Sequence, residues 1–304
     1  VLIVGGGPAG LEAARALAAR GAEVTLAEAG SEWGGRVSRE ARLPGLASWG
    51  RVRDWRLGQL KTMTNAQMYL QSSLTADDVL AYGIPHVALA TGSKWRADGV
   101  GRTHNHPLDF LSSGPVLTPD DIMDEGMAAI SGEGPVVVFD DDWFYMGSVV
   151  AEVAAKSGRE VVFVTPEAQV APFSQHTLEQ GRIQKRLLDL NVRIITAQAL
   201  AGRDATGLEL ACVYTDRLSR IDCGALISVT ARLPNDALWK ELTARKSEWA
   251  DAGIKSVTRV GDCLAPGIIA AANYSGHSYA REFGETIDPA VAPFRREDVV
   301  PVLR

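Results

Sequence analysis

The sequence predicts an α/β protein with two Rossmann-like, dinucleotide-binding domains, the second inserted into the first. Three observations lead to this prediction. The 304 residues contain two strand–helix–strand units, one at the start of the chain and one near its middle. The first unit carries a glycine loop of the nucleotide-binding type, and segments after residue 224 carry further motifs of such a domain. We therefore expect a discontinuous first domain, residues 1–110 plus 224–304, and an inserted second domain, residues 111–223.

The first unit occupies residues 1–29. Its apolar first strand, Val1–Val4, leads through the glycine loop into an alanine-rich helix at about Pro8–Arg20. Gly21 ends this helix, and a second strand follows at Glu23–Ala27. This order of strand, glycine loop, helix and strand is the arrangement that a dinucleotide-binding unit requires.

The glycine loop has the pattern G-x-G-x-x-G, formed by Gly5, Gly7 and Gly10, with Pro8 and Ala9 between the last two. Gly5 permits the tight turn, Gly7 lets a pyrophosphate approach the backbone, and Gly10 lets the helix pack closely on the strand. The helix also offers unpaired N–H groups and a partial positive charge to phosphates. The loop therefore predicts a bound adenine nucleotide; a glycine turn that binds nothing is the alternative.

Glu28 follows the second strand, eighteen residues after Gly10. An acid at this place accepts hydrogen bonds from the adenosine ribose, and it disfavours a 2′-phosphate. We therefore assign Glu28 to the nucleotide site.

The rest of the chain alternates strands and helices with less regular stretches. Residues 31–75 are expected to form a surface segment, and a pair of β segments is expected to reach Asp222. Crossings between the domains are expected near Gly114-Pro115 and Asp222. The other predicted elements are the helices Thr75–Tyr82, Gly147–Ser157 and Leu178–Leu190 and the strands His86–Ala90, Pro135–Phe139, Glu160–Thr165, Arg193–Thr196 and Ala225–Thr230.

The loop of the second unit lacks the glycines of the first. After the strand that ends at Phe139, aspartates occupy positions 140–142, followed by Trp143-Phe144-Tyr145. Asp140, Asp142 and Tyr145 stand where a dinucleotide loop needs glycine, and carboxylates repel a pyrophosphate. We therefore predict that the second domain binds neither NADH nor NADPH. Adjacent aspartates point in different directions, which argues against a metal site here.

Three motifs, in order along the chain, point back to the nucleotide site of the first domain. Thr91 and Gly92 end a strand with small residues, as backbone near a cofactor requires; a simple strand end is the alternative. Residues 230–235 form a similar strand-end turn. Asp262 precedes an alanine-rich helix at 266–272, as in the Gly-Asp motif of flavoproteins, and is expected to contact sugar or pyrophosphate oxygens. A helix-capping role is the alternative for Asp262.

Composition bounds the class of protein further. The net charge of −6 and the lack of a basic run argue against nucleic-acid binding. No apolar stretch approaches the ~20 residues that a membrane span needs. The three cysteines lack C-x-x-C spacing, which suits a reducing cytoplasm and excludes a cysteine-ligated cluster or zinc site. The chain starts inside a strand and without methionine, so we expect a piece of a longer polypeptide.

Taken together, these residues resemble the C-terminal part of trimethylamine dehydrogenase and its relatives dimethylamine and histamine dehydrogenase. The resemblance implies a glutathione-reductase-like fold and adds Gly35 and Arg36 to the cofactor-binding residues. The shared segments cover nearly the whole chain: Gly34-Gly35, Leu43–Leu46, Trp49, Arg53–Arg56, Thr75–Leu80, Ala90–Trp95, Thr177–Glu179, Leu238-Trp239, Ser247–Ala250, Gly261-Asp262, Ala265-Pro266, Gly276-His277 and Ala280–Glu282. The tail that ends at Arg304 is shorter than in the family.

The resemblance also implies the rest of the enzyme. An N-terminal barrel with FMN and a [4Fe–4S] cluster would oxidise a methylated or primary amine and pass electrons to an electron-transfer flavoprotein. The present region would hold ADP as a structural element, or FAD, would contain no catalytic and no metal-binding residue, and would contact the barrel. We also expect a homodimer.

Two other readings stay open. One is the FAD-dependent NAD(P)H oxidoreductase region of dienoyl-CoA-reductase-type enzymes, and the other is a nucleotide-bearing scaffold without an activity. Relatives carry tyrosines where this chain has Arg51–Trp55, so Trp55 is a candidate for partner docking, and packing against the barrel is the alternative. Four histidines lack metal-ligand spacing and are expected to be structural or exposed: His104, His106, His176 and His277.

Overall fold

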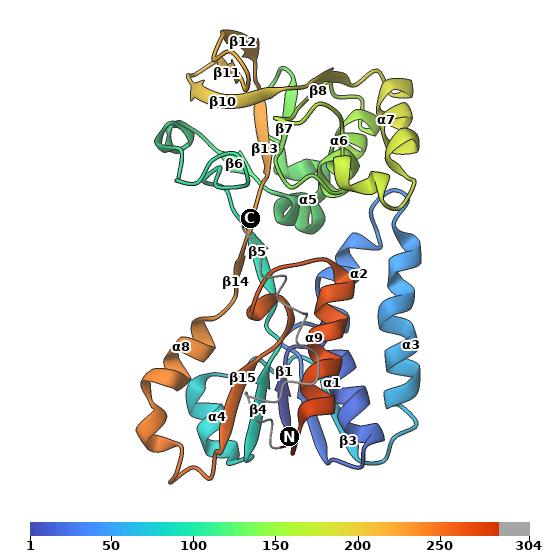
Figure 1. Ribbon diagram of the computed structural model, residues 1–304, viewed down its shortest axis with the longest axis vertical. Coiled ribbons are helices and arrows are strands. Elements are labelled where there is room, and N and C mark those ends of the chain that lie inside the picture. Colours follow the sequence, from blue (N-terminus) through green and yellow to red (C-terminus); the bar gives the residue numbers. More distant parts are fainter. Residues whose placement is uncertain (286–304) are drawn as a thin grey trace, which may run out of the picture.

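The computed structural model describes residues 1–285, so the end of the predicted first domain, 286–304, lies outside the described part. Within it, the chain forms two lobes, one above the other along the long axis in Figure 1. Each lobe contains a parallel β-sheet. The predicted α/β class with two Rossmann-like units is therefore confirmed.

The first lobe is built on the sheet that carries the glycine loop. Its strands, in spatial order and all parallel, are β15 (Ser256–Arg259), β4 (His86–Leu89), β1 (Leu2–Val4), β2 (Val24–Ala27) and β3 (Ala66–Tyr69). The outer strand β15 comes from late in the chain, so the second lobe is inserted between β4 and β15. The residues at which the domains begin and end stay a prediction.

Helices cover both faces of this sheet because its side chains alternate between them. Ile3 packs with α1 (Pro8–Ala19) and α9 (Ile269–Glu282), which lie side by side in Figure 1. The contact between the two helices depends on Gly276, since a Cβ there would lie 2.1 Å from the carbonyl oxygen of Ala9. Leu2 packs on the opposite face, with α4 (Ala76–Tyr82) and α8 (Ala237–Ala244).

The second lobe combines a parallel and an antiparallel sheet. The parallel strands are β6 (Val116–Leu117), β13 (Ala225–Val229), β7 (Val136–Asp140), β8 (Val161–Val164) and β9 (Arg193–Ile195), in this spatial order. Val138 faces a core formed with α5 (Pro119–Glu125), α6 (Met146–Lys156) and α7 (Gln180–Asp189). Phe139 faces the other core, which is closed by the antiparallel strands β10 (Gln198–Arg203), β11 (Gly207–Cys212) and β12 (Leu218–Asp222).

The two lobes are joined by a two-stranded antiparallel ribbon. Its strands are β5 (Ser93–Trp95) and β14 (Arg232–Pro234), which lie between the lobes in Figure 1. A second contact is made by α2 (Arg36–Glu40), where Arg39 forms ion pairs with Asp120 at 3.1 Å and Asp124 at 2.7 Å on α5. The lobes therefore meet at α2, the helix that begins with the predicted site residue Arg36.

Two stretches of the chain contain more helix or strand than the sequence predicts. Residues 31–75, expected to be a surface segment, are mostly exposed or half-buried and contain α2, α3 (Gly50–Leu60) and β3. The helix expected at 266–272 begins at Ile269 and continues to Glu282.

The described residues also contain short 3-10 helices: η1 (Ala47–Trp49), η2 (Asp109–Ser113), η3 (Gly126–Ala129), η4 (Pro172–Gln175), η5 (Lys246–Glu248) and η6 (Gly261–Cys263).

None of the helices in residues 1–285 combines the length and the apolar character that crossing a bilayer requires.

Candidate nucleotide-binding site

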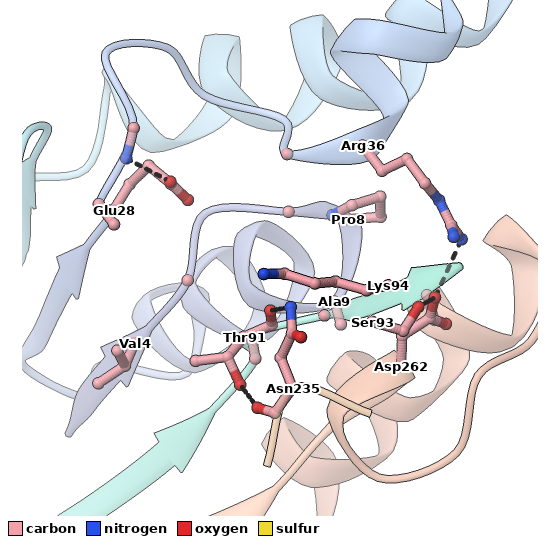
Figure 2. Close-up of a pocket in the computed structure, with 18 of the residues that line it drawn as sticks. Val4, Pro8, Ala9, Glu28, Arg36, Thr91, Ser93, Lys94, Asn235 and Asp262 are labelled. Carbon is pink, nitrogen blue, oxygen red and sulfur yellow. Dashed lines mark hydrogen bonds and ion pairs between the residues drawn. The ribbon is translucent and has the colours of Figure 1, made fainter. Parts of the chain in front are cut away.

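A cavity of about 820 Å³ opens at the carboxyl ends of β1 and β4. This edge is where parallel α/β sheets bind their ligands. The structure brings together nearly all of the residues predicted for the site, and Figure 2 shows several of them around the cavity. The predicted residues that line it are Gly5, Gly7, Pro8, Ala9, Glu28, Gly35, Arg36, Thr91, Gly92 and Asp262.

Gly10 is the predicted residue that does not line the cavity, because it packs inside the loop. A Cβ at Gly10 would lie 1.9 Å from the carbonyl oxygen of Gly5, and a Cβ at Gly5 would lie 2.3 Å from that of Ala90. Gly5 also has φ +109°, a conformation that favours glycine. Around Gly7, in contrast, no atom of residues 1–285 comes within 4 Å of the position a Cβ would take. The loop is therefore tightly packed at Gly5 and Gly10, and it leaves space at Gly7, which lines the cavity.

Glu28 lies at one end of the cavity and is held by the glycine loop. Its Oε2 accepts a 2.6 Å hydrogen bond from the N–H of Gly6, and its Oε1 accepts a 2.7 Å bond from the N–H of Gly30. These bonds fix the carboxylate beside the loop (Figure 2). Each carboxylate oxygen keeps a further lone pair, so the group can still accept hydrogen bonds from ribose hydroxyls.

Asp262 lies at the other end and does not cap the following helix. It belongs to η6, whereas α9 begins at Ile269 with Ile268 as its N-cap residue. Its Oδ2 accepts hydrogen bonds from Arg36 at 3.0 Å, Arg232 at 2.5 Å and Ser93 at 2.8 Å. The carboxylate therefore lies between two guanidinium groups, and the capping alternative is wrong.

Several residues of the site were missed in the sequence. Lys94 and Asn235 line the cavity, and Ser93 and Arg232 hold Asp262. Asn235 also exchanges two hydrogen bonds with Thr91, at 2.6 and 3.1 Å. These residues belong to the two segments of the inter-lobe ribbon. The sequence marks each segment as a strand-end motif near the cofactor. Only the pairing of β5 with β14 shows that both segments face the glycine loop.

The charges of the site continue into the contact between the lobes. Arg36 Nε lies 3.0 Å from Glu40 Oε1, and the hydroxyl of Tyr145 donates a 3.0 Å hydrogen bond to Glu40 Oε2. Burial raises the pKa of Glu40, although Arg36 opposes this. Burial, together with the Glu40 charge, also raises the pKa of Tyr145. The tyrosine is therefore a hydrogen-bond donor at every ordinary pH.

The loop of the second lobe has another geometry than the first. The loop between β7 and α6 has five residues, 141–145. The loop between β1 and α1 has three, Gly5, Gly6 and Gly7. The register in which Tyr145 replaces the third glycine is therefore wrong: the helix approaches the strand at Gly147, where a Cβ would lie 2.6 Å from Asp140 Cγ. Trp143 has φ +73°, and its ring packs near Phe173 at 5.6 Å.

Two of the three aspartates at this loop, Asp140 and Asp141, are buried in the second lobe. Asp140 is fully buried, and burial raises its pKa well above the usual value. Burial also raises the pKa of Asp142 to about 7. Asp141 accepts two 2.8 Å hydrogen bonds from Thr103. Among residues 1–285, no group of three or more His, Cys, Asp or Glu side chains is arranged to hold a metal ion.

Trp55 lies on the outer side of α3 and is 53% exposed. The guanidinium carbons of Arg15 and Arg56 lie 5.1 and 5.5 Å from the centroid of its ring. Arg56 and Arg15 also pair with the buried Glu12, which His277 contacts at 2.9 Å. The tryptophan is therefore an exposed aromatic side chain beside two arginines that a buried carboxylate holds.

This fold and this site define a nucleotide-binding protein of the two-domain Rossmann type. The family model described as NAD(P)-binding Rossmann-like domain matches residues 3–69, and the OYE-like second alpha/beta domain matches residues 117–239.

Comparison with whole proteins narrows the class. Dimethylamine dehydrogenase of Hyphomicrobium sp. (strain x) is 33% identical, over 98% of this chain and 43% of that protein. Histamine dehydrogenase from Rhizobium sp. 4-9 superposes with a TM-score of 0.94 at 50% identity, over 97% of this chain and 45% of that chain. The 6-hydroxypseudooxynicotine amine oxidase from Pseudomonas geniculata N1 gives 0.88 at 42% identity, over 93% and 41%. The chain therefore corresponds to the C-terminal region of the dimethylamine and histamine dehydrogenase family, and it spans less than half the length of these relatives.

Proposed function

We propose that this chain is the nucleotide-binding region of an FMN- and [4Fe–4S]-containing amine dehydrogenase, and that it binds ADP as a structural element. The observation that carries the proposal is the cavity between Glu28 and Asp262, with the open glycine loop between them. The ribose would lie at Glu28, and the diphosphate at Gly7 and the start of α1, where N–H groups are unpaired.

The charges at the Asp262 end favour ADP over FAD. Arg36, Arg232, Ser93 and the N–H of Gly267 all donate to the Asp262 carboxylate, which leaves it little capacity to bind a sugar alcohol. Arg36 lines the cavity, and its side chain keeps 19% of its accessible area. A guanidinium at the cavity wall suits a terminal phosphate better than an isoalloxazine-bearing sugar alcohol.

The rest of the enzyme would supply the chemistry. FMN and the cluster, bound by an N-terminal barrel, would oxidise a methylated or primary amine and deliver electrons to an electron-transfer flavoprotein. The present region would support the barrel, contribute to a cytoplasmic homodimer and help to dock the partner. Trp55, which is exposed beside Arg15 and Arg56, is the candidate docking residue.

The test is to identify the nucleotide that purified full-length protein carries. Denaturation releases it, and absorbance and mass identify it. ADP at one equivalent per chain, without flavin beyond the FMN, is the expected result. FAD in this region would instead favour the NAD(P)H oxidoreductase alternative, and a chain that neither carries nor takes up an adenine nucleotide would overturn the proposal.

A further inference from the structure

A continuous set of polar contacts connects the nucleotide cavity to the second lobe. Asp262 Oδ2 contacts Arg36 Nη2 at 3.0 Å, Arg36 Nε contacts Glu40 Oε1 at 3.0 Å, and Glu40 Oε2 accepts from the Tyr145 hydroxyl at 3.0 Å. The first three residues belong to the first lobe, and Tyr145 belongs to the second. Glu40 also lines the cavity, so a side chain of the second lobe lies one contact from the cavity wall.

The Glu40–Tyr145 contact is enclosed. Glu40 is 4% exposed, and the ring of Tyr145 stacks on Trp49, with 6.4 Å between the ring centroids and 17° between their planes. A buried carboxylate needs hydrogen-bond donors, because burial without them is costly. Arg36 forms an ion pair with Oε1, and Tyr145 donates the hydrogen bond to Oε2. The direction of the Glu40 carboxylate, and with it the position of Arg36, therefore depends on Tyr145.

We propose that Tyr145, from the second lobe, is a positioning residue for nucleotide binding in the first lobe: through Glu40 it holds Arg36 where the guanidinium meets the terminal phosphate of the nucleotide. This inference rests on the proposed nucleotide-binding function. The segment that carries Asp140, Asp142 and Tyr145 in the second lobe thus serves the site of the first lobe.

Arg36 needs this support because two carboxylates compete for it. Asp262 binds its Nη2 and Glu40 its Nε, while Nη1 has no hydrogen-bond partner within residues 1–285. A guanidinium held at two of its nitrogens has a fixed plane, because the group is planar, and Arg36 lines the cavity in this fixed position. Without the tyrosine hydroxyl, Glu40 Oε2 loses its donor and the carboxylate can rotate away from Arg36.

The experiment compares ADP with adenosine on full-length protein from which the nucleotide has been removed. Refilling of the wild type with ADP shows that removal is reversible. Tyr145→Phe deletes only the hydroxyl and keeps the stacking on Trp49. Tyr214→Phe is the matched control, because this tyrosine is 78% exposed on the second lobe. We expect Tyr145→Phe to weaken ADP binding about three- to tenfold, the effect of one hydrogen bond, and to leave adenosine within about twofold.

Two further measurements test whether Tyr145 acts on ADP binding through Glu40 and Arg36. Glu40→Gln should reproduce the selective loss for ADP, since an amide cannot pair with the guanidinium charge. In an Arg36→Gln background, Tyr145→Phe should cause no further loss, because the residue through which it acts is gone.

Three results would overturn the inference: unchanged ADP affinity in Tyr145→Phe, an equal loss for ADP and adenosine, or a full additional loss in the Arg36→Gln background. An equal loss would indicate that the tyrosine only holds the lobes together. Wild-type protein that fails to bind both ligands would overturn the proposed function, and this inference with it.

Discussion

At the residue scale, the site rests on side chains and glycines with different tasks. Glu28 and Gly7 line the cavity, and Gly5 and Gly10 close the turn. These positions were predictable because they follow from the local sequence around one turn. The Arg36–Asp262–Arg232 cluster was not predictable as a unit, because it joins three segments that only the folded chain brings together.

Replacement of Glu28 should weaken adenine nucleotides and relax the selection against a 2′-phosphate. We expect Glu28→Gln to reduce ADP affinity about tenfold, since hydrogen bonds to a charged acceptor are the stronger ones. The same variant should improve the affinity for 2′-phosphorylated ADP relative to ADP. Calorimetric titration with both nucleotides measures this, with Glu23→Gln, on the exposed surface, as the control. Equal losses for both nucleotides would contradict the assignment of Glu28 to the ribose.

The glycines of the loop should separate folding from binding. Gly7→Ala adds a methyl group where the described protein leaves space, so we expect normal thermal stability and a loss of ADP binding. Gly10→Ala places its methyl group 1.9 Å from a carbonyl oxygen, so we expect a loss of about 2 kcal/mol or more in the free energy of unfolding. Thermal unfolding together with ADP binding measures both. Retention of ADP by Gly7→Ala would place the diphosphate elsewhere.

At the element scale, the predictable elements are those with a strong apolar pattern. The strands β1, β7 and β13 are fully or almost fully buried, and each was predicted close to its observed bounds. Helix α3 was missed because only Gly50 and Leu60 in it are buried, which leaves no clear apolar stripe in the sequence. Propensity and pattern carry little information about a helix in which arginines such as Arg53 and Arg56 make many of the contacts.

The loop between β7 and α6 should make stability depend on pH. Burial raises the pKa of Asp142 to about 7, and the pKa of Asp140 is raised as well. Because the folded state binds these protons more tightly than the unfolded state, the free energy of unfolding should fall as pH rises from about 4 to about 7.

Asp142→Asn should flatten this fall and stabilise the protein at pH 8 by about 2 kcal/mol, a value reduced for partial exposure of the side chain. Denaturant unfolding at pH 5 and pH 8 measures the difference. Asp251→Asn, on the exposed surface, is the control. An equal effect of Asp142→Asn at both pH values would contradict the raised pKa.

At the scale of the whole molecule, the nested order of the two lobes was predictable from the repeated strand–helix–strand unit. Their docking was not, because it depends on contacts between residues far apart in the chain, such as Arg39 with Asp120 and Asp124. The register of the second loop was also beyond the sequence, since the two additional loop residues become visible only when the helices are compared.

The ion pairs of Arg39 should contribute modestly to this docking and should depend on salt. We expect Arg39→Ala to cost about 1 kcal/mol at low ionic strength and less at high salt, because Asp124 is exposed. Hydrogen exchange of α2 and α5 at both salt concentrations measures the loss. Arg51→Ala, exposed on α3, is the control, and a loss that does not respond to salt would exclude an electrostatic contribution.

The ribbon of β5 and β14 has a mechanical consequence. Within the described residues, both passages of the chain between the lobes run through it, so it is the axis about which one lobe would turn on the other. Ser93 and Arg232, which hold Asp262 in the cavity, are residues of this same axis. A rotation of the lobes about the ribbon would therefore displace Asp262 in the wall of the nucleotide cavity. A ligand bound in the cavity would oppose this rotation.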